Sequence, residues 1–196
     1  CLVGSEMCIR DRRKQGAGLV NLASAMATKA YLQVEGKERP KLELGDDPDK
    51  TGEYQMTFRV VNFGTEPLQY AITPTVLTEN AETKGDYGNV QVYFATQTSR
   101  DITAQTTWTT NCANNVVTVP AKGTADVTVT VKLSDALRKE LTDTFENGIY
   151  IEGYITLKQQ TTAEGVTGCD LSIPYLAFYG DWDHCLLYTS DAADEL

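Results

Sequence analysis

Apolar and polar residues alternate along much of this chain. In the segment 53–63, EYQMTFRVVNF, apolar side chains stand at every second position, namely Tyr54, Met56, Phe58 and Val60. A period of two residues is typical of a β-strand with one buried face. Strands are predicted from this alternation, or from β-branched and aromatic residues, in the segments 31–35, 53–63, 67–79, 91–96, 116–119, 127–133, 148–158 and 171–182.

Three residues interrupt the pattern inside predicted strands. Gly153 has no side chain to pack, so it predicts either a bulge or the close approach of another backbone. Pro74 and Pro174 cannot donate a hydrogen bond to a neighbouring strand, so each is expected near a sheet edge or where its strand is interrupted. The segments 148–158 and 171–182 are expected to pair as the last hairpin of the fold.

Two short helices are expected beside these strands. Residues 15–30 begin with glycines and then carry Leu19, Leu22 and Met26 at helical spacing. Ser134 is a favourable N-cap for a second helix, which would cross one end of the strands. The segments expected as linker or loop are 36–53, 79–90, 97–115 and 159–168. About seven strands with turns between them predict an all-β fold, an immunoglobulin-like or fibronectin-type-III-like β-sandwich with one short N-terminal helix and one crossing helix.

The two ends of the chain differ from the rest. CLVGSEMCIRDR at the start and CLLYTSDAADE near the end resemble translated sequencing adapters. The reverse complement of one coding sequence for MCIRD, read in a shifted frame, gives codons of CLLYT. We therefore expect residues 1–12 and 184–196 to be adapter-derived, and segments of this kind are excluded from the prediction of the fold.

Charge and composition narrow the classes of function. The formal net charge of −10 argues against a nucleic-acid partner, because lysine and arginine supply most of the affinity for phosphates. No apolar run reaches the roughly 18 residues of a membrane-spanning helix. The one histidine, His184, lies in the terminal segment, so neither a Ser-His-Asp arrangement nor a zinc site is expected. We expect no catalytic residue, no metal site and no cofactor.

An acidic turn lies in the predicted linker. Asp47, Asp49, Thr51 and Gly52 have the outline of a calcium-binding loop. Phe58 stands where an EF-hand loop needs its glutamate, and a proline occupies the second position of the loop. An acidic turn is the better interpretation.

Three further side chains leave alternatives open. Cys112 and Cys169 can form a disulfide in an extracellular protein, or they can remain two separate thiols. Trp108 is expected in a loop rich in threonine and asparagine, where an indole can stack on a sugar. A carbohydrate-binding module is therefore an alternative for the domain, as is a spacer of the adhesin type.

Several motifs resemble those of one protein family. The blocks are VVNFGTEPLQYAI, VPAKGT, NGIYIEGYITL and IPYLAFYGDW. They resemble the fibronectin-type-III-like domain that follows the catalytic domain in cell-envelope subtilisin-like serine proteinases of the lactocepin type. QGAGLVNLASAM resembles the closing segment of that catalytic domain. The resemblance divides the chain into residues 13–30, the C-terminal tail of the catalytic domain, and residues 31–183, the β-sandwich.

The resemblance also implies a function. It implies a fragment of a secreted, cell-wall-associated subtilase, a hydrolase that cleaves proteins and peptides, in which this domain supports the protease domain and shapes substrate access. The family's catalytic serine lies in a G-T-S-x-A-x-P motif, which does not occur here, so no catalytic residue is carried over. The implied partner is the catalytic domain of the same polypeptide, with docking through Leu19, Leu22 and Met26. The alternative is an extracellular adhesin-like spacer or carbohydrate-binding sandwich without a protease.

Overall fold

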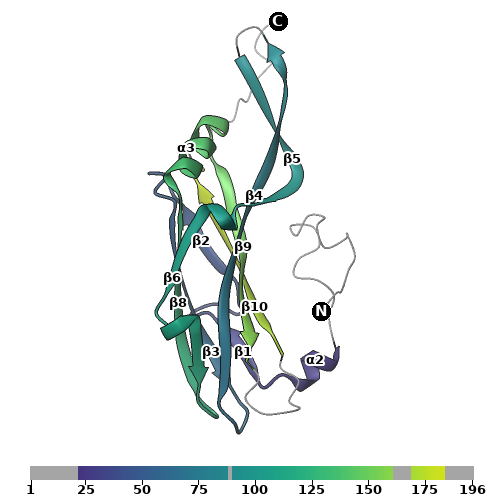
Figure 1. Ribbon diagram of the computed structural model, residues 1–196, viewed down its shortest axis with the longest axis vertical. Coiled ribbons are helices and arrows are strands. Elements are labelled where there is room, and N and C mark those ends of the chain that lie inside the picture. Colours follow the sequence, from purple (N-terminus) through teal and green to yellow (C-terminus); the bar gives the residue numbers. More distant parts are fainter. Residues whose placement is uncertain (1–21, 88–89, 161–168, 184–196) are drawn as a thin grey trace, which may run out of the picture.

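Two β-sheets pack face to face in the computed structural model, which describes residues 22–87, 90–160 and 169–183 (Figure 1). The four-stranded sheet has the order β1 (Ala30–Gln33), β3 (Glu53–Asn62), β8 (Thr124–Leu133) and β6 (Thr106–Thr110). The six-stranded sheet has the order β2 (Leu42–Asp46), β10 (Leu171–Tyr179), β9 (Ile149–Gln159), β4 (Leu68–Tyr87) and β5 (Val90–Asp101), and β7 (Val116–Val119) also pairs with β4. The prediction of an all-β sandwich is confirmed.

Few helices accompany the sheets. The described ones are α2 (Leu22–Ala27), α3 (Asp135–Thr144) and the 3-10 turns η2 (Thr103–Gln105) and η3 (Ala113–Asn115). The Ser134 hydroxyl accepts a hydrogen bond from the backbone N–H of Leu137 at 3.3 Å and so caps α3. Leu137 and Leu141 of α3 are both buried in the core.

Alternation along the strands builds the core between the sheets. In β3 every second residue from Tyr54 is buried and the intervening residues are mostly exposed. The register of β3 with β8 sets Met56 beside Val129 and Phe58 beside Val127, and all four side chains are buried. Each such side chain contributes about 1.5–3 kcal/mol by leaving water. The period of two in the sequence therefore identifies the inner face correctly.

Gly153 lies on the inner face of β9, in the middle of the six-stranded sheet. A β-carbon at this position would lie 1.9 Å from the Thr75 carbonyl oxygen of β4 and 2.9 Å from Cζ of Tyr175 in β10. The Tyr175 ring therefore lies against the glycine, and its hydroxyl donates a hydrogen bond to that same carbonyl oxygen at 3.0 Å. The predicted close approach of another backbone is confirmed, whereas the predicted bulge is wrong, because β9 pairs with β4 and β10 without a shift of register.

Both strand prolines lie where a neighbouring strand is missing on one side. Pro74 of β4 pairs with β9, but on its other side β7 covers only Leu68–Ala71 and β5 begins its pairing at Leu77. Pro174 of β10 also pairs with β9, and the pairing of β10 with β2 begins one residue later. The missing N–H groups therefore interrupt no ladder, and the expectation of a local edge is confirmed.

Two segments predicted as linker and loop form strands. The 36–53 linker contains β2, which joins the outer edge of β10 as a parallel strand and buries Leu42. The 79–90 loop is mostly strand, because β4 continues to Tyr87 and pairs with β5 in a two-stranded ribbon, the β4–β5 ribbon (79–87 and 90–99), that extends beyond the rest of the sandwich (Figure 1). The alternation in β2 is limited to Leu42 and Leu44, and the 79–90 segment has none, so the sequence gives little sign of either strand.

Replacement of Gly153 tests how tightly the three strands are packed. Gly153→Ala places a methyl group against a carbonyl oxygen that belongs to the sheet, so we expect a loss of about 3 kcal/mol or more in the free energy of unfolding. Gly36→Ala is the matched control, since Gly36 has a positive φ of 71° but no atom within 4 Å of the position that a β-carbon would take. We expect it to cost only about 1 kcal/mol. Urea unfolding of both variants measures the difference, and equal losses would contradict the tight contact at Gly153.

Candidate functional site

Helix α2 carries the apolar side chains expected to contact a catalytic domain. Leu22 and Met26 are 72% and 84% exposed, although both are large and apolar. The third predicted docking residue, Leu19, lies outside the described residues. Leu22 and Met26 stand four residues apart, so they share one face of the helix. Their exposure leaves that face free for a partner, but the docking itself stays a prediction.

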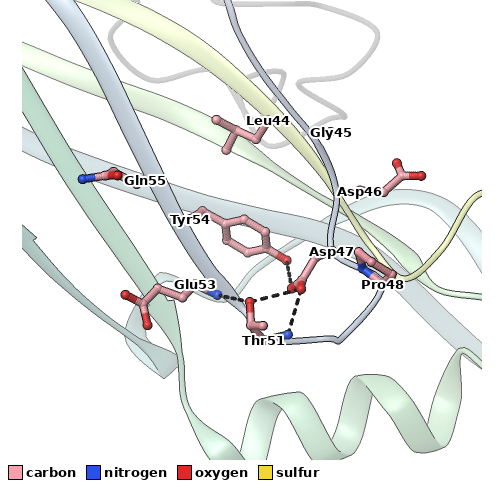
Figure 2. Close-up of a pocket in the computed structure, with 9 residues that line it drawn as sticks. All are labelled: Leu44, Gly45, Asp46, Asp47, Pro48, Thr51, Glu53, Tyr54 and Gln55. Carbon is pink, nitrogen blue, oxygen red and sulfur yellow. Dashed lines mark hydrogen bonds between the residues drawn. The ribbon is translucent and has the colours of Figure 1, made fainter.

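A shallow pocket of about 250 Å³ lies where β2 turns into β3 (Figure 2). Asp47 lies at its centre, and its carboxylate accepts four hydrogen bonds. The donors are the Thr51 N–H at 2.9 Å, the Thr51 hydroxyl at 3.1 Å, the Gly52 N–H at 2.8 Å and the Tyr54 hydroxyl at 3.4 Å. The carboxylate therefore closes the turn that it belongs to, through bonds to backbone N–H groups four and five residues further along the chain.

The backbone of Asp47 ties the same turn to β10. Its N–H donates to the Phe178 carbonyl at 2.8 Å, and its own carbonyl accepts from the Gly180 N–H at 3.1 Å. Burial, followed by the charge of Asp47, raises the pKa of Tyr54 above its ordinary value, so this hydroxyl remains a donor. The pocket is smaller than the roughly 300–1,000 Å³ of typical ligand sites, and the hydrogen bonds of its central carboxylate are already used within the turn. We assign it a structural role.

The structure places the two cysteines and Trp108 as follows. Cys112 and Cys169 are half-buried free thiols, and the predicted disulfide between them stays a prediction. Trp108 lies in strand β6 and packs against the core, so the prediction of a loop position is wrong. The sequence leaves room for one short strand in the segment 97–115 but does not locate β6, because TTWTT is an edge strand with little apolar alternation. A partly buried indole offers less surface for a sugar than an indole on an open loop.

Trp182 lies beyond the end of β10. It is 54% exposed, and its ring contacts Tyr150 and Phe178. Its ring therefore packs on aromatic side chains of β9 and β10 near the end of the domain.

The described part of the chain contains neither a metal-binding cluster nor a membrane-spanning helix. Within residues 22–87, 90–160 and 169–183, no group of three or more His, Cys, Asp or Glu side chains is arranged to hold a metal ion. None of the helices in these same ranges is long and apolar enough to span a membrane.

Substitution of Asp47 tests its role in the turn. Asp47→Asn keeps one acceptor oxygen and replaces the other by an NH2 group. This NH2 group cannot accept a hydrogen bond from the N–H of Gly52 or Thr51, so we expect a loss of about 2 kcal/mol in the free energy of unfolding. Asp49→Asn is the matched control, because Asp49 is an exposed aspartate of the same turn, and we expect a change within about 0.5 kcal/mol. Thermal or urea unfolding gives both values. Equal stabilities of the two variants would show that the buried carboxylate does not hold the turn.

Known proteins that match this chain agree with its architecture. The model of the Fn3-like domain family matches residues 42–176. C5a peptidase of Streptococcus pyogenes serotype M3 is 29% identical over 170 residues, which cover 87% of this chain and 12% of that protein. PI-type proteinase of Lactococcus lactis subsp. cremoris is 26% identical over 174 residues, which cover 87% of this chain and 8% of that protein.

Among solved structures, a match is found to the ASH / PapD-like domain of human CEP192, with 10% identity, coverage of 78% of this chain and 85% of that one, and a TM-score of 0.44. A likeness at this TM-score says nothing about function. The curated relatives are far longer than the matched region, so this chain spans about an eighth of C5a peptidase. The chain belongs to the Fn3-like domain family, and its resemblance to the fibronectin-type-III-like domains of subtilisin-like cell-envelope proteinases is confirmed.

Proposed function

We propose that this chain is a non-catalytic accessory domain of a secreted, cell-wall-associated subtilisin-like serine endopeptidase, in which it supports the catalytic domain and shapes substrate access. One observation carries the proposal. A helix with an exposed apolar face, α2, stands directly before the sandwich in a chain whose relatives include C5a peptidase and PI-type proteinase. Apolar side chains that one short helix cannot bury by itself suit contact with a neighbouring domain.

In this proposal the sandwich supports the catalytic domain mechanically. The sandwich has a continuous core from both sheets, so it is a stiff body on which a neighbouring domain can rest. Residues 13–30 are assigned to the tail of the catalytic domain, and Leu22 and Met26 of this tail are proposed to pack against the rest of that domain, as is Leu19. The β4–β5 ribbon extends furthest from the sandwich (Figure 1), and we assign to it the shaping of substrate access.

The experiment that tests this proposal is sequencing of the source locus upstream of residue 13. A G-T-S-x-A-x-P motif some tens of residues before Gln15, with aspartate and histidine motifs further upstream, is the expected result. A further β-repeat at that place would overturn the protease assignment and favour a spacer. Sugar-dependent quenching of Trp108 fluorescence would favour the carbohydrate-binding alternative instead.

The docking of α2 is tested with Leu22→Asp in the parent polypeptide. The new carboxylate would lie without a charge partner at the centre of an apolar interface, so we expect the free energy of docking to weaken by about 2 kcal/mol or more. We also expect an added protease to cleave the parent faster. Ala27→Asp is the matched control, since Ala27 is exposed on the same helix but projects away from the face of Leu22 and Met26. Neither substitution should change the unfolding of the isolated chain. If Leu22→Asp leaves the parent's thermal stability and proteolysis unchanged, the docking is wrong.

A further inference from the structure

The β4–β5 ribbon has an outer edge along β5 (Figure 1). Within residues 22–87, 90–160 and 169–183, β5 pairs with β4 alone, so the other side of β5 faces no described strand. In an antiparallel strand, alternate residues direct their N–H and C=O groups to the same side. The outer side of β5 therefore presents a row of backbone donors and acceptors.

The pairing with β4 keeps one stretch of this row regular. Residues 93–95 pair in step with 81–83, and residues 90–91 pair with 86–87. Between these two runs the extra residue lies on β4, so the bulge bends β4 and leaves β5 continuous. Beyond residue 95 three residues of β5 stand opposite one residue of β4, which ends the regular stretch. We name residues 90–95, VQVYFA, the β5 edge.

The β5 edge lacks the features that usually keep an exposed strand from pairing with other chains. Charged side chains, prolines and short strand length are the common protections. β5 has 12 residues, and its residues 90–99 include neither a charged residue nor a proline. In the other strand of the same ribbon, residues 79–87 include four charged ones, Glu79, Glu82, Lys84 and Asp86. The ribbon is therefore protected along β4 and unprotected along β5.

The other edges of the described sheets are short or charged. β1 and β7 have four residues each and β6 has five. β2 also has five, and its Glu43 pairs with Lys37 at 3.0 Å and with Lys41 at 2.5 Å. A segment of about six residues with high β-propensity and no charge is prone to add strands. The β5 edge is of this kind, which indicates that it has a partner.

The chemistry of the edge indicates what that partner is. A row of backbone donors and acceptors is matched by a second extended backbone, as in β-strand addition. Residues 79–87 of the adjacent strand carry three acidic residues against one lysine, and the whole chain has a net charge of −10. These charges attract a basic polypeptide and repel an acidic one. A second copy of this chain carries the same negative charge, so it fits the edge less well.

We propose that the β5 edge binds an extended, uncharged or basic stretch of a protein substrate by β-strand addition. The substrate role rests on the proposed function, in which the ribbon shapes substrate access, but the pairing edge does not. Main-chain hydrogen bonds supply the affinity, so the edge recognises the extended backbone and the charge of the substrate more than its exact sequence. A substrate held there is tethered to the protease chain, which raises its local concentration.

Hydrogen exchange of the isolated chain tests the pairing with two synthetic peptides. One peptide of about ten residues alternates lysine with valine and threonine, and the other carries two prolines at its centre, which removes donors from both of its edges. At saturation we expect the first peptide to slow exchange of alternate amides of residues 90–95 about tenfold. The amides of the β6 edge are the internal control and should not change. Unchanged exchange at 90–95, or equal protection by the proline peptide, would overturn the proposal.

A matched pair of lysine variants tests where the peptide binds. Val92→Lys adds a charge to the β5 edge, and Thr83→Lys adds the same charge to β4 of the ribbon. We expect Val92→Lys to weaken binding of the lysine peptide about tenfold and Thr83→Lys to change it by less than about twofold. Equal weakening by both variants would show that only net charge matters and would overturn the pairing edge. If Val92→Lys loosens the ribbon, exchange of the unaltered chain decides the matter.

Kinetics of the parent polypeptide separate this inference from the proposed function. In an active protease, Val92→Lys should raise the KM for reduced and alkylated ribonuclease, an unfolded basic protein, about fivefold and leave cleavage of a short peptide unchanged. An unchanged KM would overturn the substrate as the partner. Peptide binding in a parent without protease motifs would uphold the pairing edge and overturn the proposed function. A dimer of the isolated chain in sedimentation velocity that Val92→Lys abolishes would overturn the choice of partner.

Discussion

The sandwich depends on the close contact of three strands at Gly153. The Thr75 carbonyl and the Tyr175 ring both lie against the backbone of Gly153. The Tyr175 hydroxyl donates a hydrogen bond to the Thr75 carbonyl at 3.0 Å. This contact fixes β4, β9 and β10 at one register, because a shift by one residue would bring a side chain to the position of the glycine. Burial raises the pKa of Tyr175 above its ordinary value, so its hydroxyl keeps the proton of that hydrogen bond.

The rigid centre explains where the functional surfaces lie. β4, β9 and β10 are fixed, and the departures from a simple sandwich occur at their margins, where β2 joins β10, the β4–β5 ribbon extends outward and α2 leads into β1. Asp47 connects one such margin to the centre, since its carboxylate closes the turn into β3 and its backbone bonds to β10. The apolar side chains of α2 therefore lie next to a sandwich whose central strands have little freedom to adjust.

The sequence predicts the strands that show a long alternation of apolar residues and misses those that do not. The alternation in 53–63 and the strand-forming residues of 148–158 are evident because one side of each strand is packed against the other sheet. β2 and the outer half of β4 escape prediction, since pairing at an edge is made by backbone groups, which every residue carries. Of the two alternatives predicted at Gly153, a bulge or the close approach of another backbone, the close approach is found, but only the fold shows that the approaching group is the Thr75 carbonyl of β4.

Native-state hydrogen exchange of the β9 amides tests the central claim most directly. If the contact at Gly153 holds the sandwich together, the amides of residues 151–157 exchange only through global unfolding, with a free energy equal to that from urea unfolding of the same protein. Exchange of these amides through local opening, at a lower free energy than the amides of β8, would show that the strands around Gly153 separate while the rest stays folded. That result would contradict the dependence of the sandwich on the Gly153 contact.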